Sequence, residues 1–569
     1  MPTKPSNLIY GIDDKPGLGT VLMLGLQHIF ILSIAFIFPV VIIDAIGGTP
    51  EQAQHLISIS MIVTGIGTIL QGIKRGPVGS GYLGPHVNGP AYLTASLMAG
   101  KIGGLPLIFG MTALSGVFEA LFSRIISRMR ALFPAEVTGT IVMMVGIEII
   151  PLGAKKFLGL DMLHPTTDLT AFFVALITLL AMVSFNVWGK GKLRLYSVLI
   201  GLSIGYAVAL FTGILTTEHI NHVLHSPFFS FPPIGQTGLS FNVTLVIPFM
   251  VATLSSALKT MGDLTTCQKI NDTEWKRPDM KSISRGILAC SVSNLLSGAT
   301  GALGQSLSSS NVGLSIATGA TSRRIAYSTG GILIFIAFFP KLAAIFVIMP
   351  TPIMGASLVF AACFMILAGI QIMMSRMIDA RKTFVIGLSI VFGLSVEFAP
   401  ELYRDIHPWI QPLTTSSLSL ATVCAIVLNL LFRVGIAKSQ AIELEPGIDS
   451  SEKIFTFMEN QGSLWGARKE VIYRAISALN EFMESANELQ LAKGKIKTDV
   501  SFDEFNLDMN IIYQGALMEF PETKPTEDEL LHDQSAFTRL SGFLMRSHAD
   551  KVKSSVKDGQ CRIQFHFDH

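Results

Sequence analysis

Charged residues are scarce in this chain: Asp, Glu, Lys and Arg make up 14% of its 569 residues, whereas hydrophobic residues make up 50%. Soluble globular proteins carry about 25% charged residues. The shortage of charge excludes a typical soluble enzyme, and the hydrophobic excess predicts a protein that crosses the bilayer many times.

Cysteine is also rare, with 5 residues that form no C-x-x-C pair and no cluster with histidine. This excludes a disulfide-bonded secreted scaffold and gives no reason to expect a metal or other cofactor. Residues 1–17 lack the basic region, short apolar run and cleavage site of a signal peptide, so we expect no segment to be removed. Basic residues are spread over short loops without forming a patch, which argues against nucleic-acid binding.

Hydrophobic segments separated by loops that contain Gly, Pro or charge predict fourteen membrane spans, since one span needs about 20 apolar residues. Their approximate limits are 18–43, 55–73, 80–100, 104–122, 136–153, 168–188, 195–213, 243–265, 284–301, 308–320, 327–348, 353–374, 382–398 and 415–432. The sequence therefore predicts an all-α polytopic membrane region over residues 18–435, preceded by a cytoplasmic N-terminus at 1–17.

The third and tenth of these segments are the poorest helices, because both are rich in Gly, Ser and Asn and the third also contains Pro. They lie seven segments apart, and interrupted helices at corresponding positions of two halves indicate the central site of an inverted-repeat transporter. Backbone groups freed inside a membrane must line an enclosed cavity or meet a ligand. A ligand site between two inverted seven-span repeats is one interpretation; two loops that dip inward and bind nothing is the other.

Lys and Arg show which side of the membrane each loop occupies. The loops that share a side with the N-terminus hold most of the basic residues before residue 450, whereas the opposite loops hold only Lys101, Lys155, Lys156, Lys341 and Arg404. Positive loops stay inside. We therefore expect a multi-pass protein of the plasma membrane, of the bacterial inner-membrane type, with both termini in the cytoplasm.

Five motifs follow one another in an order and spacing typical of one transporter family. They are residues 25–28 (GLQH), 134–140 (PAEVTGT), 262–265 (GDLT), 311–319 (NVGLSIATG) and 349–355 (MPTPIMG). The fourth is the most specific, because it matches the pattern N-x-G-x-x-x-x-T-[RKG] of the tenth span. Over roughly residues 15–435 the chain resembles the nucleobase-ascorbate transporter family, also called nucleobase:cation symporter-2.

The resemblance implies a fold of fourteen spans in two inverted repeats. It implies a core domain (about 18–122 and 243–348) and a gate domain (about 136–213 and 353–432), through which members commonly form homodimers. A small solute would bind between short strands of spans 3 and 10 and cross by alternating access, with a proton or sodium as the coupling ion. Exposed backbone amides and a side-chain amide suit the alternating donors and acceptors of a nucleobase edge.

Three polar positions depart from the family pattern. Lys259 stands where members similar to purine and uracil permeases carry a Glu that grips the nucleobase. Ser310 stands at a signature position that is usually Gln or Glu, and Cys290 replaces an Asp that helps proton coupling in several members. Proton coupling through the usual carboxylate is therefore in doubt, and Asp263 is the remaining titratable candidate.

A Lys at mid-membrane costs about 2.5–3.5 kcal/mol on insertion scales. We therefore expect Lys259 either to form an ion pair or to have a functional role. Asp263 lies four residues later on the same helical face and can pair with it. One interpretation is a neutral pair that only supports the core. The other, which we favour, is that Lys259 faces the cavity and selects an anionic or carbonyl-rich solute such as urate or a xanthine anion.

The candidate site comprises two sets of residues. The predicted substrate contacts are Lys259, Asp263, Ser310, Asn311, Val312, Gly313, Val87 and Asn88. The predicted coupling or supporting residues are Asp263, Gln27, His28, Thr318 and Cys290. His28 could equally be a core histidine bonded to the backbone or a residue that positions span 10. His86 and Asn88 could line the cavity or serve turn chemistry alone.

Beyond residue 445 the composition becomes that of a soluble domain of about 120 residues. We place a linker at 436–450 and a cytoplasmic α+β regulatory domain at 451–569, with helical spacing at 471–483 and strand-like alternation at 497–508 and 562–567. This part weakly resembles the histidine-kinase-like ATPase domains of anti-sigma kinases. Ser485 occupies the position of their Mg-binding Asn and no D-x-G-x-G loop is present, which favours a degenerate regulatory or assembly module with a cytoplasmic partner over an active ATPase.

The sequence as a whole predicts a secondary transporter of a nucleobase-like solute such as xanthine, urate or uracil, and not an enzyme. A membrane sensor that signals through the C-terminal domain is an alternative, motivated by the changed anchors and the added domain. An anion transporter similar to the sulfate permeases is a third, which the signature at 311–319 does not favour.

Overall fold

A computed structural model describes most of the chain. The description leaves out residues 1–3, 7, 127–131, 161–167, 191, 192, 194, 195, 233, 234, 236, 237, 274, 276, 277, 375–377, 404, 405, 407–410, 415, 434, 436, 450, 527–531, 533, 534 and 558. Several basic residues that entered the orientation prediction lie outside the described residues: Arg128, Arg130, Lys192, Arg194, Lys276, Arg277, Arg376 and Arg404.

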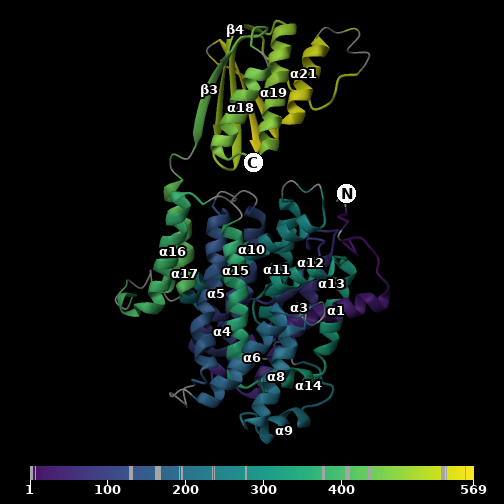
Figure 1. The fold of residues 1–569 in the computed structure, drawn as a ribbon, viewed down its shortest axis with the longest axis vertical. Helices are drawn as coiled ribbons and strands as arrows, with labels where there is room; N and C mark the ends of the chain where they lie inside the picture. The colour runs from purple at the N-terminus through teal and green to yellow at the C-terminus, as the bar shows by residue number, and fades with distance from the viewer. Residues whose placement is uncertain are drawn as a thin grey trace. The chain divides into compact units, whose positions relative to one another are not determined.

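The chain divides into two compact units, Met1–Leu430 and Leu431–His569. Unit 1 is helical (Figure 1). Its α-helices are α1 Leu18–Leu32, α2 Ile37–Ala45, α3 Pro50–Gly72, α4 Leu93–Ile125, α5 Ala135–Phe157, α6 Leu169–Val187, α8 Ser197–Phe211, α9 Thr217–His225, α10 Val246–Ile270, α11 Met280–Thr300, α12 Ser309–Thr318, α13 Arg323–Ile336, α14 Pro340–Val347, α15 Thr351–Met373, α16 Ala380–Phe398 and α17 Ser417–Phe432.

Each predicted span overlaps at least one of these helices. Among the described residues, seven helices are long and apolar enough to cross a membrane, or eight if α13 and α14, bent by 85° at their junction, form one span. The apolar runs and the helical bundle together make this a multi-pass helical membrane protein. Helix α9 was not predicted.

The predicted helix breaks are present, with one correction. In the third segment, strand β1 His86–Asn88 and a 3₁₀ turn at Pro90–Tyr92 precede α4. In the tenth, the extended residues are strand β2 Gln305–Leu307, so the break lies before the predicted segment, and residues 309–318 are helical.

Within unit 1, α3 packs against α11 and α13 and α4 packs against α10 and α11, whereas α15 packs against α5 and α6. We call α1–α4 and α10–α14 the core group and α5, α6, α8 and α15–α17 the gate group, after the two domains that the sequence predicts; the division into two domains stays a prediction. Small residues allow close packing within each group. A Cβ added at Gly139 of α5 would lie 2.6 Å from the carbonyl oxygen of Gly369 in α15, and one added at Gly65 of α3 would lie 2.6 Å from that of Gly330 in α13.

Unit 2 is an α+β layer structure with its own hydrophobic core. Its antiparallel sheet has the order β3-β4-β5-β7-β6, and three helices cover one face (Figure 1). The elements are β3 Lys438–Leu444, α18 Ser451–Trp465, α19 Lys469–Glu488, β4 Ala492–Phe502, β5 Asn506–Gly515, α21 Ser535–His548, β6 Lys551–Lys557 and β7 Gln560–Asp568.

The sheet of unit 2 corrects two sequence predictions. Strand β3 lies inside the stretch predicted as a linker at 436–450, because its seven residues pair with β4. The alternation at 497–508 belongs to two strands, since the chain turns between Phe502 and Asn506. The predicted helix at 471–483 and the closing strand at 562–567 are confirmed within α19 and β7.

Candidate functional site

The two broken segments meet as a short antiparallel strand pair in the core group. His86 pairs with Leu307, Val87 with Ser306 and Asn88 with Gln305. Side chains alternate between the two faces of a strand, so Val87 lies on one face and His86 and Asn88 on the other. The side chain of Val87 is partly exposed, whereas those of His86 and Asn88 are buried.

Lys259 lies at the end of this strand pair. From α10 its Nζ donates a 2.5 Å hydrogen bond to the carbonyl oxygen of Leu307, the last residue of β2, and lies 3.3 Å from Oδ2 of Asp263. Both side chains keep 12% of their surface exposed. The predicted ion pair is therefore present, and the ammonium group also holds the backbone of β2.

The first turns of α12 expose two of the predicted site residues, and the space beside one of them, Gly313, is open. Ser310 and Gly313 are exposed, and a Cβ added at Gly313 would meet no atom within 4 Å. Val312 is buried on the opposite side of the helix. Gly262, next to Asp263, faces Ile372 of the gate group at 3.7 Å from an added Cβ. Ser310, Gly313 and the Lys259–Asp263 pair therefore keep exposed surface, whereas Val312 faces the protein interior.

Asn311 has no exposed surface, and its amide contacts the scaffold. Nδ2 lies 3.0 Å from both the carbonyl oxygen and Nδ1 of His28, and Oδ1 accepts from the Ser308 hydroxyl at 2.9 Å. Since an amide N–H donates, Nδ1 of His28 accepts, which requires a neutral ring. The structure thus brings His28 and Asn311 together as a support for α12, and direct reading of the solute by Asn311 stays a prediction that these contacts do not favour.

We expect Asn311→Ala to lower stability, because it leaves buried polar groups of His28 and Ser308 unpaired at a cost of about 1–3 kcal/mol. Thermal unfolding in detergent measures this. Thr318→Ala on the same helix is the matched control, since among the described residues the Thr318 hydroxyl bonds only the Leu314 carbonyl oxygen of its own helix. Equal melting temperatures for the Asn311→Ala variant and wild type would contradict a supporting role.

The remaining predicted residues lie inside the core group. Asn88 donates to the carbonyl oxygen of Ala35 and accepts from Gln305, so its buried amide is engaged by the core group. The thiol of Cys290 lies 3.8 Å from Nε2 of His86 and 3.8 Å from the hydroxyl of Thr260. Gln27 is buried, and its Oε1 has no hydrogen-bond partner among the described residues. The roles of these residues as substrate contacts or coupling groups remain predictions.

Sequence reasoning missed a buried polar cluster beside the strand pair. Glu119 of α4 has no exposed surface, and its Oε2 accepts a 2.7 Å hydrogen bond from Asn294 of α11. Asn294 also contacts the Tyr92 hydroxyl and the backbone of Gln305. A carboxylate inside a predicted span is costly and marks a candidate functional group. That signal was present at Glu119 in the sequence.

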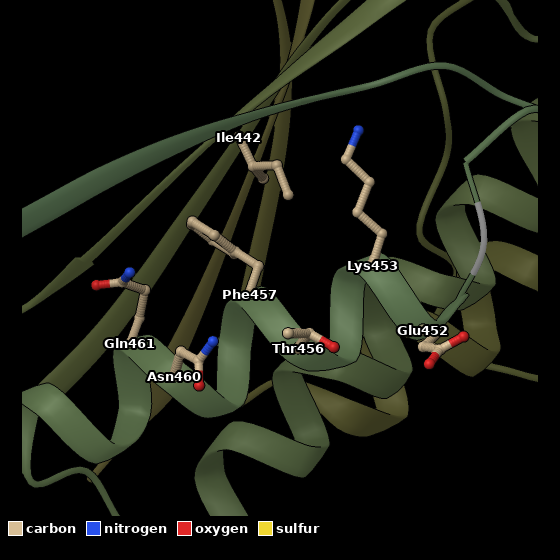
Figure 2. A pocket seen from close by; sticks show the side chains of 7 residues that line it. All are labelled: Ile442, Glu452, Lys453, Thr456, Phe457, Asn460 and Gln461. Carbon is tan, nitrogen blue, oxygen red and sulfur yellow. The ribbon is translucent and has the colours of Figure 1, made fainter.

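Unit 2 has a shallow groove of its own between β3 and α18, with a volume of 480 Å³ (Figure 2). Phe457 of α18 and Ile442 of β3 supply its apolar part, and Lys453 and Glu452 supply charge. Within the described residues, no group of three or more His, Cys, Asp or Glu side chains is placed to hold a metal ion.

Comparison with known proteins decides the family of unit 1. A model of the Permease family, that of xanthine and uracil permeases, matches residues 19–402. The chain belongs to this nucleobase-ascorbate transporter family. As a member of a permease family it is a membrane transporter and not an enzyme.

Several named relatives align with this chain over nearly their whole length. The chain is 27% identical to the xanthine permease XanP of Escherichia coli, over 76% of this chain and 96% of the relative. It is 28% identical to a xanthine permease of Bacillus subtilis, over 76% and 98%. It is 29% identical to a predicted purine permease of Clostridium perfringens, over 79% and 97%. Unit 2 lies beyond the part that the family model matches.

Among solved structures, the transmembrane domain of a cyanobacterial bicarbonate transporter aligns with a TM-score of 0.45 and 14% identity, over 74% of this chain and 100% of that domain. An anion transporter of the solute carrier 26 family aligns with a TM-score of 0.49 and 12% identity, over 77% and 72%.

Proposed function

We propose that the chain is a secondary active transporter of a nucleobase-like solute of the xanthine class, which binds between the strand pair of the core group and the gate group. The observation that carries this is the coincidence of named xanthine permeases as full-length relatives with two broken segments that pair as β1 and β2 beside the partly exposed Lys259–Asp263 pair. Lys259 favours a solute that offers a carbonyl oxygen or an anionic edge to its ammonium group. A permease family does not favour the sensor alternative.

The proposal includes the finer architecture. Fourteen spans would form two inverted repeats, with β1 and β2 at corresponding positions, and the gate group would supply a homodimer interface. Both termini would lie in the cytoplasm, and solute would cross as the core group moves against the gate group, driven by protons or sodium. Support comes from the position of the two broken helices and from the separate packing of the two groups.

Uptake into proteoliposomes tests the function. Purified protein in phosphatidylethanolamine and phosphatidylglycerol vesicles should take up labelled xanthine, and excess unlabelled urate or uracil should reveal selectivity by competition. Vesicles without protein are the control. Saturable binding of xanthine without any uptake would support the sensor instead, and neither binding nor uptake of any purine or pyrimidine would contradict the proposal.

For unit 2 we propose a regulatory or assembly role without nucleotide chemistry. Ser485 of α19 is buried, and its hydroxyl bonds the carbonyl oxygen of Glu481 in its own helix, so it presents no ligand for a magnesium ion. The apolar side of α19 packs into the core of unit 2.

We expect the full-length protein not to bind ATP at micromolar concentrations, because unit 2 has no D-x-G-x-G loop and Ser485 stands at the position of the Mg-binding Asn. Equilibrium dialysis with labelled ATP and magnesium measures this, with a chain truncated after residue 430 as the control for binding elsewhere. Saturable ATP binding that the truncation removes would contradict the prediction.

A further inference from the structure

Glu119 is a buried carboxyl group that the proposed site does not use. It has no exposed surface, and no cationic side chain of the described residues forms an ion pair with it. Its Oε2 accepts one hydrogen bond and its Oε1 has no partner in the described part of the chain. An ionised carboxylate with one neutral donor and no cation is costly in the protein interior, so this conformation holds Glu119 as the neutral acid.

The partner of Glu119 is the residue that holds both broken segments. Nδ2 of Asn294 lies 2.7 Å from Glu119 Oε2, 3.2 Å from the Tyr92 hydroxyl and 3.3 Å from the Gln305 carbonyl oxygen. Its Oδ1 accepts a 2.5 Å bond from the Gln305 backbone N–H. Tyr92 follows β1 in the chain, and Gln305 begins β2. Asn294 therefore contacts both sides of the strand pair and the carboxyl group at once.

The amide of Asn294 has too few hydrogens for these acceptors. An NH₂ group has two N–H donors, and three acceptors surround it. A hydrogen bond to an ionised carboxylate is roughly twice as strong as one to a neutral acid. Loss of the proton from Glu119 would therefore draw one N–H firmly to the carboxylate and leave the other for either Tyr92 or Gln305. The charge of Glu119 thus decides how tightly Asn294 holds β1 and β2.

The strand pair connects the hydrogen bonds of Asn294 to the proposed solute site. The side chain of Gln305 donates to Asn88 of β1 and accepts from Thr64 of α3. Two residues further along β2, the carbonyl oxygen of Leu307 accepts from Lys259. Hydrogen bonds therefore link Glu119 through Asn294 to Gln305, the backbone of β2 links Gln305 to Leu307, and a further hydrogen bond links Leu307 to Lys259.

Other titratable groups surround this set. Tyr92 and the Cys290 thiol of α11 lie within electrostatic range of Glu119. His86 of β1 contacts Cys290, and Lys259 and Asp263 face the same thiol from α10. Of these, only Glu119 bonds Asn294 through a carboxyl group, so its ionisation acts directly on the residue that holds the strands.

We propose that Glu119 is the proton-binding group that couples protonation to the strand pair and so to solute movement. This rests on the proposed transport function. Bound proton would accompany solute in one direction, and its release would alter the hold of Asn294 on β1 and β2 before the empty site returns. Glu119 is a positioning residue in this scheme, since it acts on the solute site through Asn294.

The test uses Glu119→Gln, which keeps the shape of the side chain and fixes it as neutral. It compares proton-driven transport with passive transport in this variant and in wild type. In sodium-free proteoliposomes with a gradient of one pH unit, a one-proton symporter concentrates its solute about tenfold. We expect wild type to concentrate labelled xanthine, and Glu119→Gln to bring it only to equal concentrations inside and outside. Exchange of labelled for unlabelled xanthine should stay within about threefold of wild type, since exchange needs no net proton movement.

Glu148→Gln is the matched control, because Glu148 is a buried carboxyl group of the gate group that accepts a hydrogen bond from Ser416 and, within the described residues, has no hydrogen bond to β1, β2 or Asn294. It should still concentrate xanthine. A second readout needs no transport: the infrared band of a protonated carboxyl group at neutral pH should be smaller in Glu119→Gln than in wild type.

The outcomes are distinguishable. Concentration of xanthine by Glu119→Gln, or an unchanged infrared band, would overturn the present inference while leaving a nucleobase transporter in place. Equal loss of driven transport in Glu119→Gln and Glu148→Gln would also overturn it, since the effect would not depend on Asn294. Absence of xanthine, urate and uracil transport by wild type would contradict the proposed function itself.

Discussion

Lys259→Ala should weaken binding of xanthine by roughly 10- to 150-fold while the protein remains folded and inserted, because a hydrogen bond to a charged group contributes about 1.5–3 kcal/mol. The ammonium group lies at the end of β2 and keeps part of its surface exposed, so a solute carbonyl can approach it. Isothermal titration of the purified protein with xanthine measures the change. Unchanged affinity would contradict a solute contact at Lys259.

Asp263→Asn separates the two interpretations of the pair. If Lys259 and Asp263 only support the core, both substitutions should lower the melting temperature alike and leave affinity unchanged. If Lys259 binds solute, Asp263→Asn should preserve or strengthen binding. The Asp263 carboxylate, 3.3 Å from the ammonium group, would then no longer compete with the solute for it.

Lys259→Glu needs a compensating change. A glutamate there would face Asp263 four residues later, and like charges at this spacing repel. We therefore expect recognition of neutral nucleobases only in the Lys259→Glu, Asp263→Asn double variant.

Gly313→Val should reduce the rate of xanthine uptake more than tenfold, with wild-type amounts of protein in the membrane. A Cβ added at Gly313 meets no protein atom within 4 Å, so a valine side chain extends into volume that the proposed solute would need. Valine is also no worse a helix former than glycine, so α12 should not lose stability. Uptake per amount of reconstituted protein measures the effect.

Gly331→Val is the matched control, because Gly331 is an exposed glycine of α13 whose added Cβ also meets no atom within 4 Å. It should transport at the wild-type rate. Wild-type uptake by the Gly313→Val variant would mean that solute passes elsewhere, and equal loss in both variants would point to a general effect of valine on the helices.

The sequence predicted the bundle well because a membrane span is a local property. Each span needs its own apolar run, since lipid offers no partner for backbone groups, and so the segments could be placed without knowledge of their neighbours. The same holds for Lys259 and Asp263, whose spacing on one helix predicted the observed ion pair. The boundary of unit 2 depends on a distant part of the chain. The residues of β3 were predicted as a linker because their strand partner, β4, lies more than fifty residues later.

The sequence by itself determined a multi-pass helical membrane protein, its broken third segment and its family signature at 311–319, whereas the second break lies at Gln305–Leu307, just before the predicted tenth segment. Tertiary structure alone decided which polar groups face the open space, because adjacent residues of α12 point in different directions: Asn311 turns inward to His28, whereas Ser310 and Gly313 are exposed. It also decided the contact between Glu119 and Asn294, which lie 175 positions apart. Such contacts depend on how whole helices pack, and no local pattern of residues encodes that arrangement.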